Sequence, residues 1–178
     1  MKSLIAIFGI AVALSVETAS AQWTFQATLL GTGENPANAS TATGFGTVVL
    51  NAAQTQITVN ESWTGLIGGP ATASHIHGPG GIGPTGPTNA SVIFPFTGVP
   101  AATSGSIPQQ SFAITAQQVS WLFSGFLYMN VHDATFGGGE IRGQLLLVPE
   151  PGTAALLGLG TGAIAIRIIR KRAKRLRG

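Results

Sequence analysis

Apolar and polar residues alternate along much of the chain, and this alternation limits the fold more than any other feature of the sequence. In residues 23–29 (WTFQATL), the apolar residues Trp23, Phe25, Ala27 and Leu29 are separated by single polar residues. Successive side chains of a β-strand point to opposite faces of a sheet, so the segment is typical of a strand with one buried face. Charged residues make up only 8% of the chain, which disfavours a bundle of surface helices.

Further short segments show strand character and are separated by turns rich in glycine and proline. Strands are predicted at residues 45–50, 56–63, 74–77, 91–96, 111–115, 126–132 and 140–147. Pro95 places its strand at a sheet edge or a bulge. A single helix is predicted at residues 116–123, with Thr115 as its N-cap and Gly125 at its end. We therefore expect an all-β, antiparallel Greek-key β-sandwich, immunoglobulin-like or superoxide-dismutase-like, with one short helix.

Charge is distributed unevenly along the 178 residues. The chain has 9 Lys and Arg against 6 Asp and Glu, but seven of these cations lie in the last twelve positions. Between Gln22 and Val148, Arg142 is the only cation among four acidic residues. The basic character therefore belongs to the ends, and nucleic-acid binding is not expected. The chain has no cysteine, which excludes disulfides, thiol nucleophiles and cysteine-based metal sites.

Residues 1–21 have the features of a secretory signal peptide. Lys2 precedes an apolar run of 13 residues from Leu4 to Val16, which is too short to span a bilayer. Ala19-Ser20-Ala21 then supplies the small residues of a cleavage site, so signal peptidase is expected to cut between Ala21 and Gln22. The alternative is an uncleaved N-terminal anchor.

Residues 149–178 contain three parts in a fixed order. Pro149-Glu150-Pro151 precedes an uncharged, mostly apolar run from Gly152 to Ile166, predicted to be a hydrophobic transmembrane helix, and a basic block from Arg167 to Arg177 follows. This arrangement resembles the PEP-CTERM protein-sorting signal of Gram-negative bacteria. The resemblance implies a membrane-anchored intermediate, recognition of the three-residue motif by an exosortase, and release to the cell surface or the exterior. A permanent single-span anchor is the alternative.

Two segments of the region 22–148 resemble the CHRD (chordin-repeat) domain. They are residues 73–80 (ASHIHGPG) and residues 127–132 (LYMNVH), the latter followed by residues 139–145 (GEIRGQL). The resemblance implies an extracellular β-sandwich module and no established activity for bacterial members. The leading hypothesis is accordingly a non-enzymatic structural or binding module, with extracellular polysaccharide or matrix proteins as partners.

All three histidines of the chain lie in these two segments. His75 and His77 are two residues apart on a predicted strand and therefore share a face, as do Tyr128, Asn130 and His132 on another. If the two strands are neighbours, His75, His77 and His132 converge, and imidazole nitrogens suit copper or zinc. The competing hypothesis is thus a metal-binding envelope protein that could be redox-active. The alternative role of the histidines is structural, with ring N–H groups bonded to backbone carbonyls or to Asn130.

Other functional patterns are sparse. Arg142 is expected to form an ion pair with Glu140 or Asp133, the nearest acidic residues in the sequence. The sequence has no nucleophile elbow and no phosphate-binding loop, and no enzymatic activity is predicted.

Overall fold

The computed structural model describes residues 22–80, 82–83 and 86–149. The predicted signal peptide, Ala21 of the cleavage site, and Glu150 and Pro151 of the sorting motif lie outside the described residues, as does the predicted C-terminal hydrophobic helix. In the part of the chain that the structure does describe, no helix is long and apolar enough to traverse a bilayer.

Three long strands form the centre of the fold. β1 (Trp23–Leu30), β2 (Thr43–Leu50) and β3 (Gln56–Thr64) pair antiparallel along their whole lengths. Each strand alternates buried and more exposed residues, as the sequence pattern predicts. Phe25, Val48 and Val59 lie side by side on the buried face.

The remaining elements are shorter. They are a 3-10 turn, η1 (Gly31–Gly33), one helix, α1 (Ala116–Phe123), and the strands β4 (Ala73–His77), β5 (Ile82–Gly83), β6 (Gly86–Pro87), β7 (Val92–Pro95), β8 (Gly105–Ser106), β9 (Gln110–Ala113), β10 (Tyr128–His132), β11 (Ile141–Gln144) and β12 (Leu146–Leu147).

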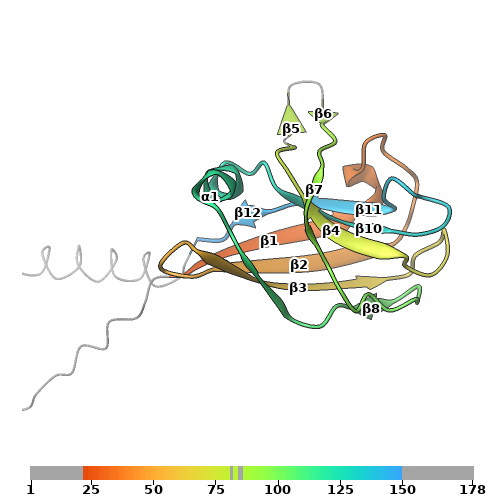
Figure 1. The fold of residues 1–178 in the computed structure, drawn as a ribbon. Coiled ribbons are helices and arrows are strands. Elements are labelled where there is room, and N and C mark those ends of the chain that lie inside the picture. Colours follow the sequence, from red (N-terminus) through yellow and green to blue (C-terminus); the bar gives the residue numbers. More distant parts are fainter. Residues whose placement is uncertain (1–21, 81, 84–85, 150–178) are drawn as a thin grey trace, which may run out of the picture.

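Ten strands form one sheet, which curls around a single core (Figure 1). The order along the sheet is β7-β4-β10-β11-β1-β2-β3-β8, with β12 paired to β1 and β9 paired to β3. The curl brings β7, at one end of this order, close to β9, which pairs with β3 near the other end. The ring centroids of Phe94 on β7 and Phe112 on β9 are 5.4 Å apart. β5 and β6 form a separate two-stranded ribbon above the sheet.

The prediction of an all-β antiparallel fold with one short helix is confirmed. Each predicted strand is present within a few residues of its expected bounds, and α1 has the expected bounds. Thr115 caps α1 with a full capping box, and Gly125 follows it with a φ of +71°. β7, which ends at Pro95, is an edge strand of the sheet, as that proline indicates. The short elements β5, β6, β8 and η1 were not predicted.

One polar contact crosses the core between the two halves of the curled sheet. Glu61 on β3 is 3% exposed, and its carboxyl group is hydrogen-bonded to the hydroxyl of Ser74 on β4. The same hydroxyl lies 2.8 Å from the carbonyl oxygen of Asn130. A hydroxyl has one proton to donate, so both bonds form together when Glu61 is protonated and donates to Ser74. Burial favours this state, because it raises the pKa of Glu61 from 4.5 to about 8.

The Glu61→Gln substitution should reduce the loss of stability with rising pH. Between the ordinary pKa near 4.5 and the folded pKa near 8, the folded protein retains a proton that the unfolded chain has lost. The free energy of unfolding of the parent chain should therefore fall across this interval. The side-chain amide of the variant cannot ionise and still donates to Ser74. Urea denaturation at pH 5, 6, 7 and 8 measures the difference.

Glu34→Gln is the matched control for this series. Burial raises the pKa of Glu34 only to about 7. Its substitution should therefore remove part of the loss below pH 7 and leave the loss between pH 7 and 8 in place. Equal pH profiles for the parent chain and Glu61→Gln would show that Glu61 is ionised in the folded protein.

Candidate metal centre

The pairing of β4 with β10 brings the three histidines onto one face of the sheet. In this antiparallel pair, His75 lies opposite Asn130 and His77 opposite Tyr128. His132 is two residues beyond Asn130 and therefore points to the same side. Ile76 and Met129, which oppose each other between these pairs, point into the core and are completely buried. The expectation that the two motif strands are neighbours is confirmed.

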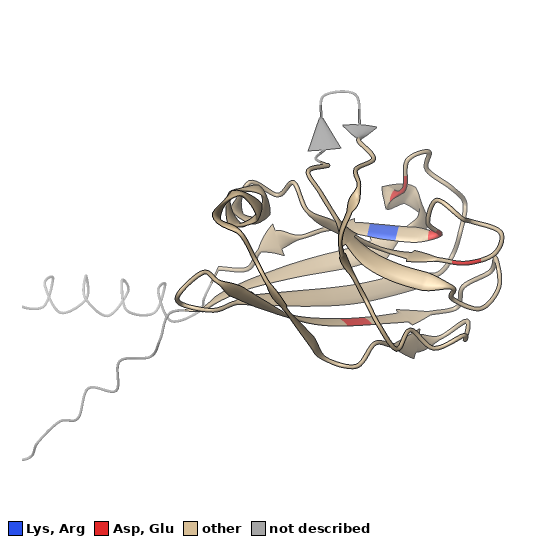
Figure 2. Ribbon diagram, in the orientation of Figure 1, with Lys and Arg blue, Asp and Glu red and all other residues tan. Residues whose placement is uncertain are grey.

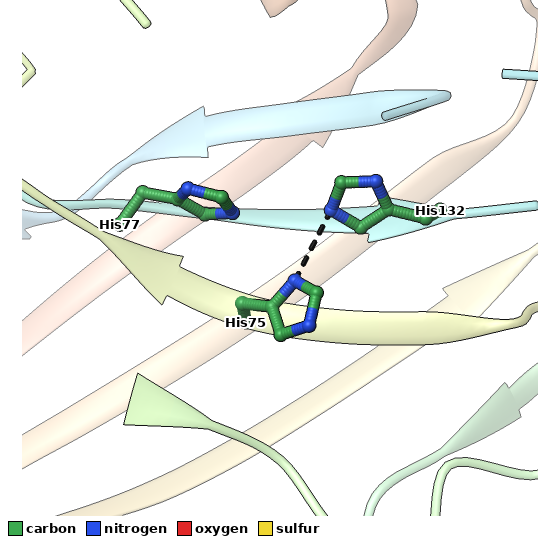
Figure 3. A group of neighbouring side chains, drawn as sticks. All are labelled: His75, His77 and His132. Atoms are coloured by element: carbon green, nitrogen blue, oxygen red, sulfur yellow. Dashed lines mark hydrogen bonds between the residues drawn. The ribbon is translucent and has the colours of Figure 1, made fainter. Parts of the chain in front are cut away.

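The three imidazole rings converge above β4 and β10 (Figure 3). One ring nitrogen from each of His75, His77 and His132 lies within 4.8 Å of the other two. The shortest separation, 3.2 Å, joins His75 Nδ1 and His132 Nε2. Nitrogen ligands about 2.0–2.1 Å from a tetrahedral metal ion are about 3.3 Å from each other, so this pair already has the spacing of two ligands.

Two of the rings are oriented by backbone carbonyls on their outer sides. His77 Nδ1 lies 2.9 Å from the carbonyl oxygen of Ala90, and His132 Nδ1 lies 3.0 Å from that of Gly137. Carbonyl oxygens only accept, so each Nδ1 carries the proton and each Nε2 presents a lone pair. His77 Nε2 is buried and has no hydrogen-bond partner in the structure. Metal-ligating histidines are usually held in this way, by a bond from the ring nitrogen that does not bind the metal.

Asn130 adds an oxygen atom beside the imidazoles. Its Oδ1 lies 3.0 Å from His132 Nε2, while its Nδ2 donates to the carbonyl of Gly138 over 3.3 Å. With Nδ1 of His132 protonated, both Nε2 of His132 and Oδ1 of Asn130 direct lone pairs toward the same space. Two facing acceptors repel each other unless a cation or a shared proton lies between them. From the sequence, Asn130 is predicted only as a hydrogen-bond partner of the histidines.

Burial keeps the histidines neutral. It lowers the pKa of His75 to about 4, with a further contribution from the neighbouring His132 and His77. Burial also lowers the pKa of His77 and of His132 below the ordinary value of 6.5. Neutral imidazole is the form that binds metal ions, so the cluster needs no deprotonation at neutral pH before it can act as a ligand set.

Tyr128 and Arg142 support the cluster from the side of β11. The rings of His77 and Tyr128 stack with centroids 4.9 Å apart and an angle of 4°, and the guanidinium carbon of Arg142 lies 3.3 Å from the Tyr128 ring centroid. The Arg142 Nη atoms donate to Thr88 O over 3.0 Å and to Asn89 Oδ1 over 3.3 Å. Arg142, only 2% exposed, thus ties the 88–89 loop to the sheet.

The predicted ion pair of Arg142 with Glu140 or Asp133 is wrong. Glu140 precedes β11, after Gly139 with a φ of +127°, and its carboxylate accepts hydrogen bonds from the Ser40 hydroxyl and two backbone amides. Arg142, inside the strand, extends along the face of the Tyr128 ring. The acidic residue whose charge interacts with Arg142 is Glu34 instead.

Comparison with known families agrees with this arrangement. The family model described as the CHRD domain matches residues 25–145, which is most of the chain and all of the sheet except the first two residues of β1 and the whole of β12. The chain belongs to the CHRD-domain family. No curated protein and no solved structure matches it.

A second family model, the PEP-CTERM protein-sorting motif, matches residues 147–172. This CHRD protein is therefore exported, passes through a membrane-anchored intermediate, and is sorted by an exosortase to the surface of a Gram-negative bacterium. Neither the CHRD domain nor the sorting motif defines an enzyme family.

An acid pair next to the histidines links three loops of the CHRD domain. Glu140 is fully buried and accepts hydrogen bonds from the backbone amides of Ile67 at 2.8 Å and Gly68 at 3.0 Å. Burial raises the pKa of Asp133, and its contact with Glu140 raises it further. Burial acts in the same direction on Glu140, but hydrogen bonds from Asp133, Ser40 and the two amides outweigh it and lower the pKa of Glu140. Of the two carboxyl groups, Glu140 is therefore the one whose charge the surroundings favour.

Glu140→Gln should destabilise the CHRD domain far more than Asp133→Asn. The side-chain amide introduced by Glu140→Gln would place a donor against the backbone amides that now bond a carboxylate, and each such charged bond contributes about 1.5–3 kcal/mol. The neutral amide introduced by Asp133→Asn has nearly the same shape and keeps an acceptor for the amides of Thr135 and Phe136. We expect losses of about 2–3 kcal/mol for Glu140→Gln and under about 1 kcal/mol for Asp133→Asn in urea denaturation. The reverse order would place the proton on Glu140.

Proposed function

We propose that the exported CHRD domain is a non-enzymatic binding module that holds one copper or zinc ion through His75, His77 and His132. The observation that carries this proposal is the convergence of three imidazole nitrogens within 4.8 Å of one another. Two of these rings have their other nitrogen bonded to a backbone carbonyl, so their free nitrogens are aimed at the cluster.

A structural role for the histidines accounts less well for the unpaired atoms. Buried polar atoms in folded proteins almost always have a partner, and leaving one unsatisfied costs about 1–3 kcal/mol. His77 Nε2 is buried without one, and His132 Nε2 faces the oxygen of Asn130. A cation satisfies these lone pairs together, whereas hydrogen bonds within the cluster depend on the few protons of the His75 ring and the Asn130 amide.

The chemistry of the ligands selects the class of metal. Imidazole nitrogen suits copper and zinc, whereas calcium and magnesium take oxygen ligands. Three histidines leave one position of a tetrahedral ion for the Asn130 oxygen or a water molecule. The three nitrogens must draw closer on binding, because a spread of up to 4.8 Å exceeds the tetrahedral spacing of about 3.3 Å.

His132→Gln should abolish tight binding of one equivalent of zinc or copper. The experiment uses the mature chain from Gln22 with its tail, purified in detergent, and isothermal titration calorimetry. The parent chain should bind one ion, and loss of one of three ligands should weaken the affinity at least 100-fold. Asp133→Asn, a polar substitution at the next residue, is the matched control and should leave the affinity unchanged.

The same titration tests the structural alternative. If the parent chain and His132→Gln bind metal with equal affinity, or if neither binds, the histidines serve only as hydrogen-bonding groups and the metal proposal is wrong. A loss of affinity in Asp133→Asn equal to that in His132→Gln would place the ion at the acid pair instead.

Replacement of Pro149-Glu150-Pro151 by three alanines should block removal of the tail. We propose that the exosortase recognises these three residues, so the variant should accumulate as the membrane-anchored form. Immunoblotting of membrane and surface fractions from the producing bacterium, with His132→Gln as a correctly sorted control, follows the mass of the protein. Normal tail removal in the alanine variant would show that recognition lies elsewhere.

A further inference from the structure

A patch of exposed apolar side chains lies at one end of the CHRD domain. Its members come from the start of β1, the end of α1, the loop before β10 and the whole of β12. They are the half-buried Trp23 and the exposed residues Phe123 (40%), Phe126 (45%), Leu146 (57%) and Leu147 (46%). We call these five residues the apolar end patch.

Direct contacts hold the apolar end patch together. The ring centroid of Phe123 lies 5.7 Å from that of Trp23 and 5.3 Å from that of Phe25. Phe25 is in turn the cross-strand partner of Leu147. The amide of Leu145 donates to Leu127 O over 2.9 Å, which continues the β10–β11 register and sets Phe126 opposite Leu146. Trp23, Phe123 and Leu147 therefore lie on one face of this end and Phe126 and Leu146 on the other, so apolar side chains flank β12 on both sides.

The apolar end patch lies where the domain begins and ends. β1 starts and β12 finishes at the end of the molecule that carries α1 (Figure 1). The acidic residues and Arg142 lie away from α1 (Figure 2), and β1, α1 and β12 contain no charged residue. If an apolar surface covered this end, no charged side chain of these three elements would lose its hydration.

The sequence beyond β12 determines what lies next to this end. Val148 is followed by Pro149-Glu150-Pro151 and then by the apolar run from Gly152. Three residues span at most about 10 Å, so the apolar end patch cannot be far from the bilayer that receives this run. Aromatic and leucine side chains are the groups that proteins place at the boundary of headgroups and acyl chains.

We propose that the apolar end patch rests on the lipid bilayer while the tail anchors the protein. The contact fixes the orientation of the CHRD domain, and it holds the sorting motif at the membrane surface, where a membrane-embedded exosortase must find it. The proposal does not depend on the metal centre, since it concerns other residues and another step in the life of the protein.

Single cysteines test this orientation without interference, because the chain contains no cysteine. Phe126→Cys reports on the patch from a position more than 20 residues before the tail. Phe45→Cys is the matched control, because both phenylalanines are 45% exposed. Phe45 pairs with Thr28, five residues along β1 from Trp23, which corresponds to about 17 Å.

The mature chain, with its tail, is spin-labelled at each site and reconstituted in liposomes of phosphatidylethanolamine and phosphatidylglycerol. Electron paramagnetic resonance then measures collisions of the label with oxygen, which concentrates in lipid, and with a water-soluble nickel chelate. The ratio of oxygen to nickel collisions should be at least fivefold higher at Phe126→Cys than at Phe45→Cys. In detergent-free urea, which unfolds the domain, the two labels should give equal ratios, because the fold no longer holds either of them at the bilayer.

Equal ratios for the two labels in liposomes would overturn the proposal. Dipolar broadening of the Phe126→Cys spectrum without access to oxygen would also overturn it, since a second copy of the chain would then cover the patch. Quenching of tryptophan fluorescence by brominated lipids gives a second measurement on the unsubstituted chain. Trp23 and the half-buried Trp121 of α1 should be quenched, and absence of any quenching would contradict the contact.

Discussion

The antiparallel register between β4 and β10 is the contact on which the candidate site depends. It sets Ser74 and Ile76 against Val131 and Met129 inside the core, and it sets His75 and His77 outside, beside the residues that complete the histidine cluster. A shift of one residue would exchange the two faces of β4, burying imidazoles and exposing Ile76. The core and the cluster are therefore specified by the same pairing, and the packing of Ile76 and Met129 protects the geometry of the histidines.

The two ends of the domain differ in their side chains. One end carries the sorting signal and exposes apolar side chains without charge. Beyond it lie the histidines and the buried acid pair, held by the 88–90 and 137–138 loops. In the proposed orientation, this polarity would direct the histidine cluster away from the membrane while the protein is anchored. The basic character of the whole chain gives no information about a ligand of the domain, because the cations lie almost entirely in the predicted signal peptide and the tail.

The alternation of the sequence predicts much of this fold, because side-chain period and burial are local properties of a strand. The strand bounds and the shared face of His75 and His77 follow from it, and α1 follows from its N-cap Thr115 and the glycine after it. The partners of the histidines could not be predicted, since Ala90 and Gly137 contribute only carbonyl oxygens from loops. The Glu61–Ser74 contact depends on the curl of the sheet, which no local pattern encodes. Arg142 was assigned the wrong partner because its position on Tyr128 and near Glu34 is a consequence of strand order, which residue spacing does not encode.

The central claim is that three imidazoles of one CHRD domain share a single metal ion. X-ray absorption spectroscopy of the zinc-loaded mature chain tests it most directly, because scattering from imidazole rings reveals their number. The account predicts nitrogen or oxygen ligands at about 2.0–2.1 Å and multiple scattering from three rings. A first shell of oxygen atoms with the scattering of one ring, or of none, would contradict it.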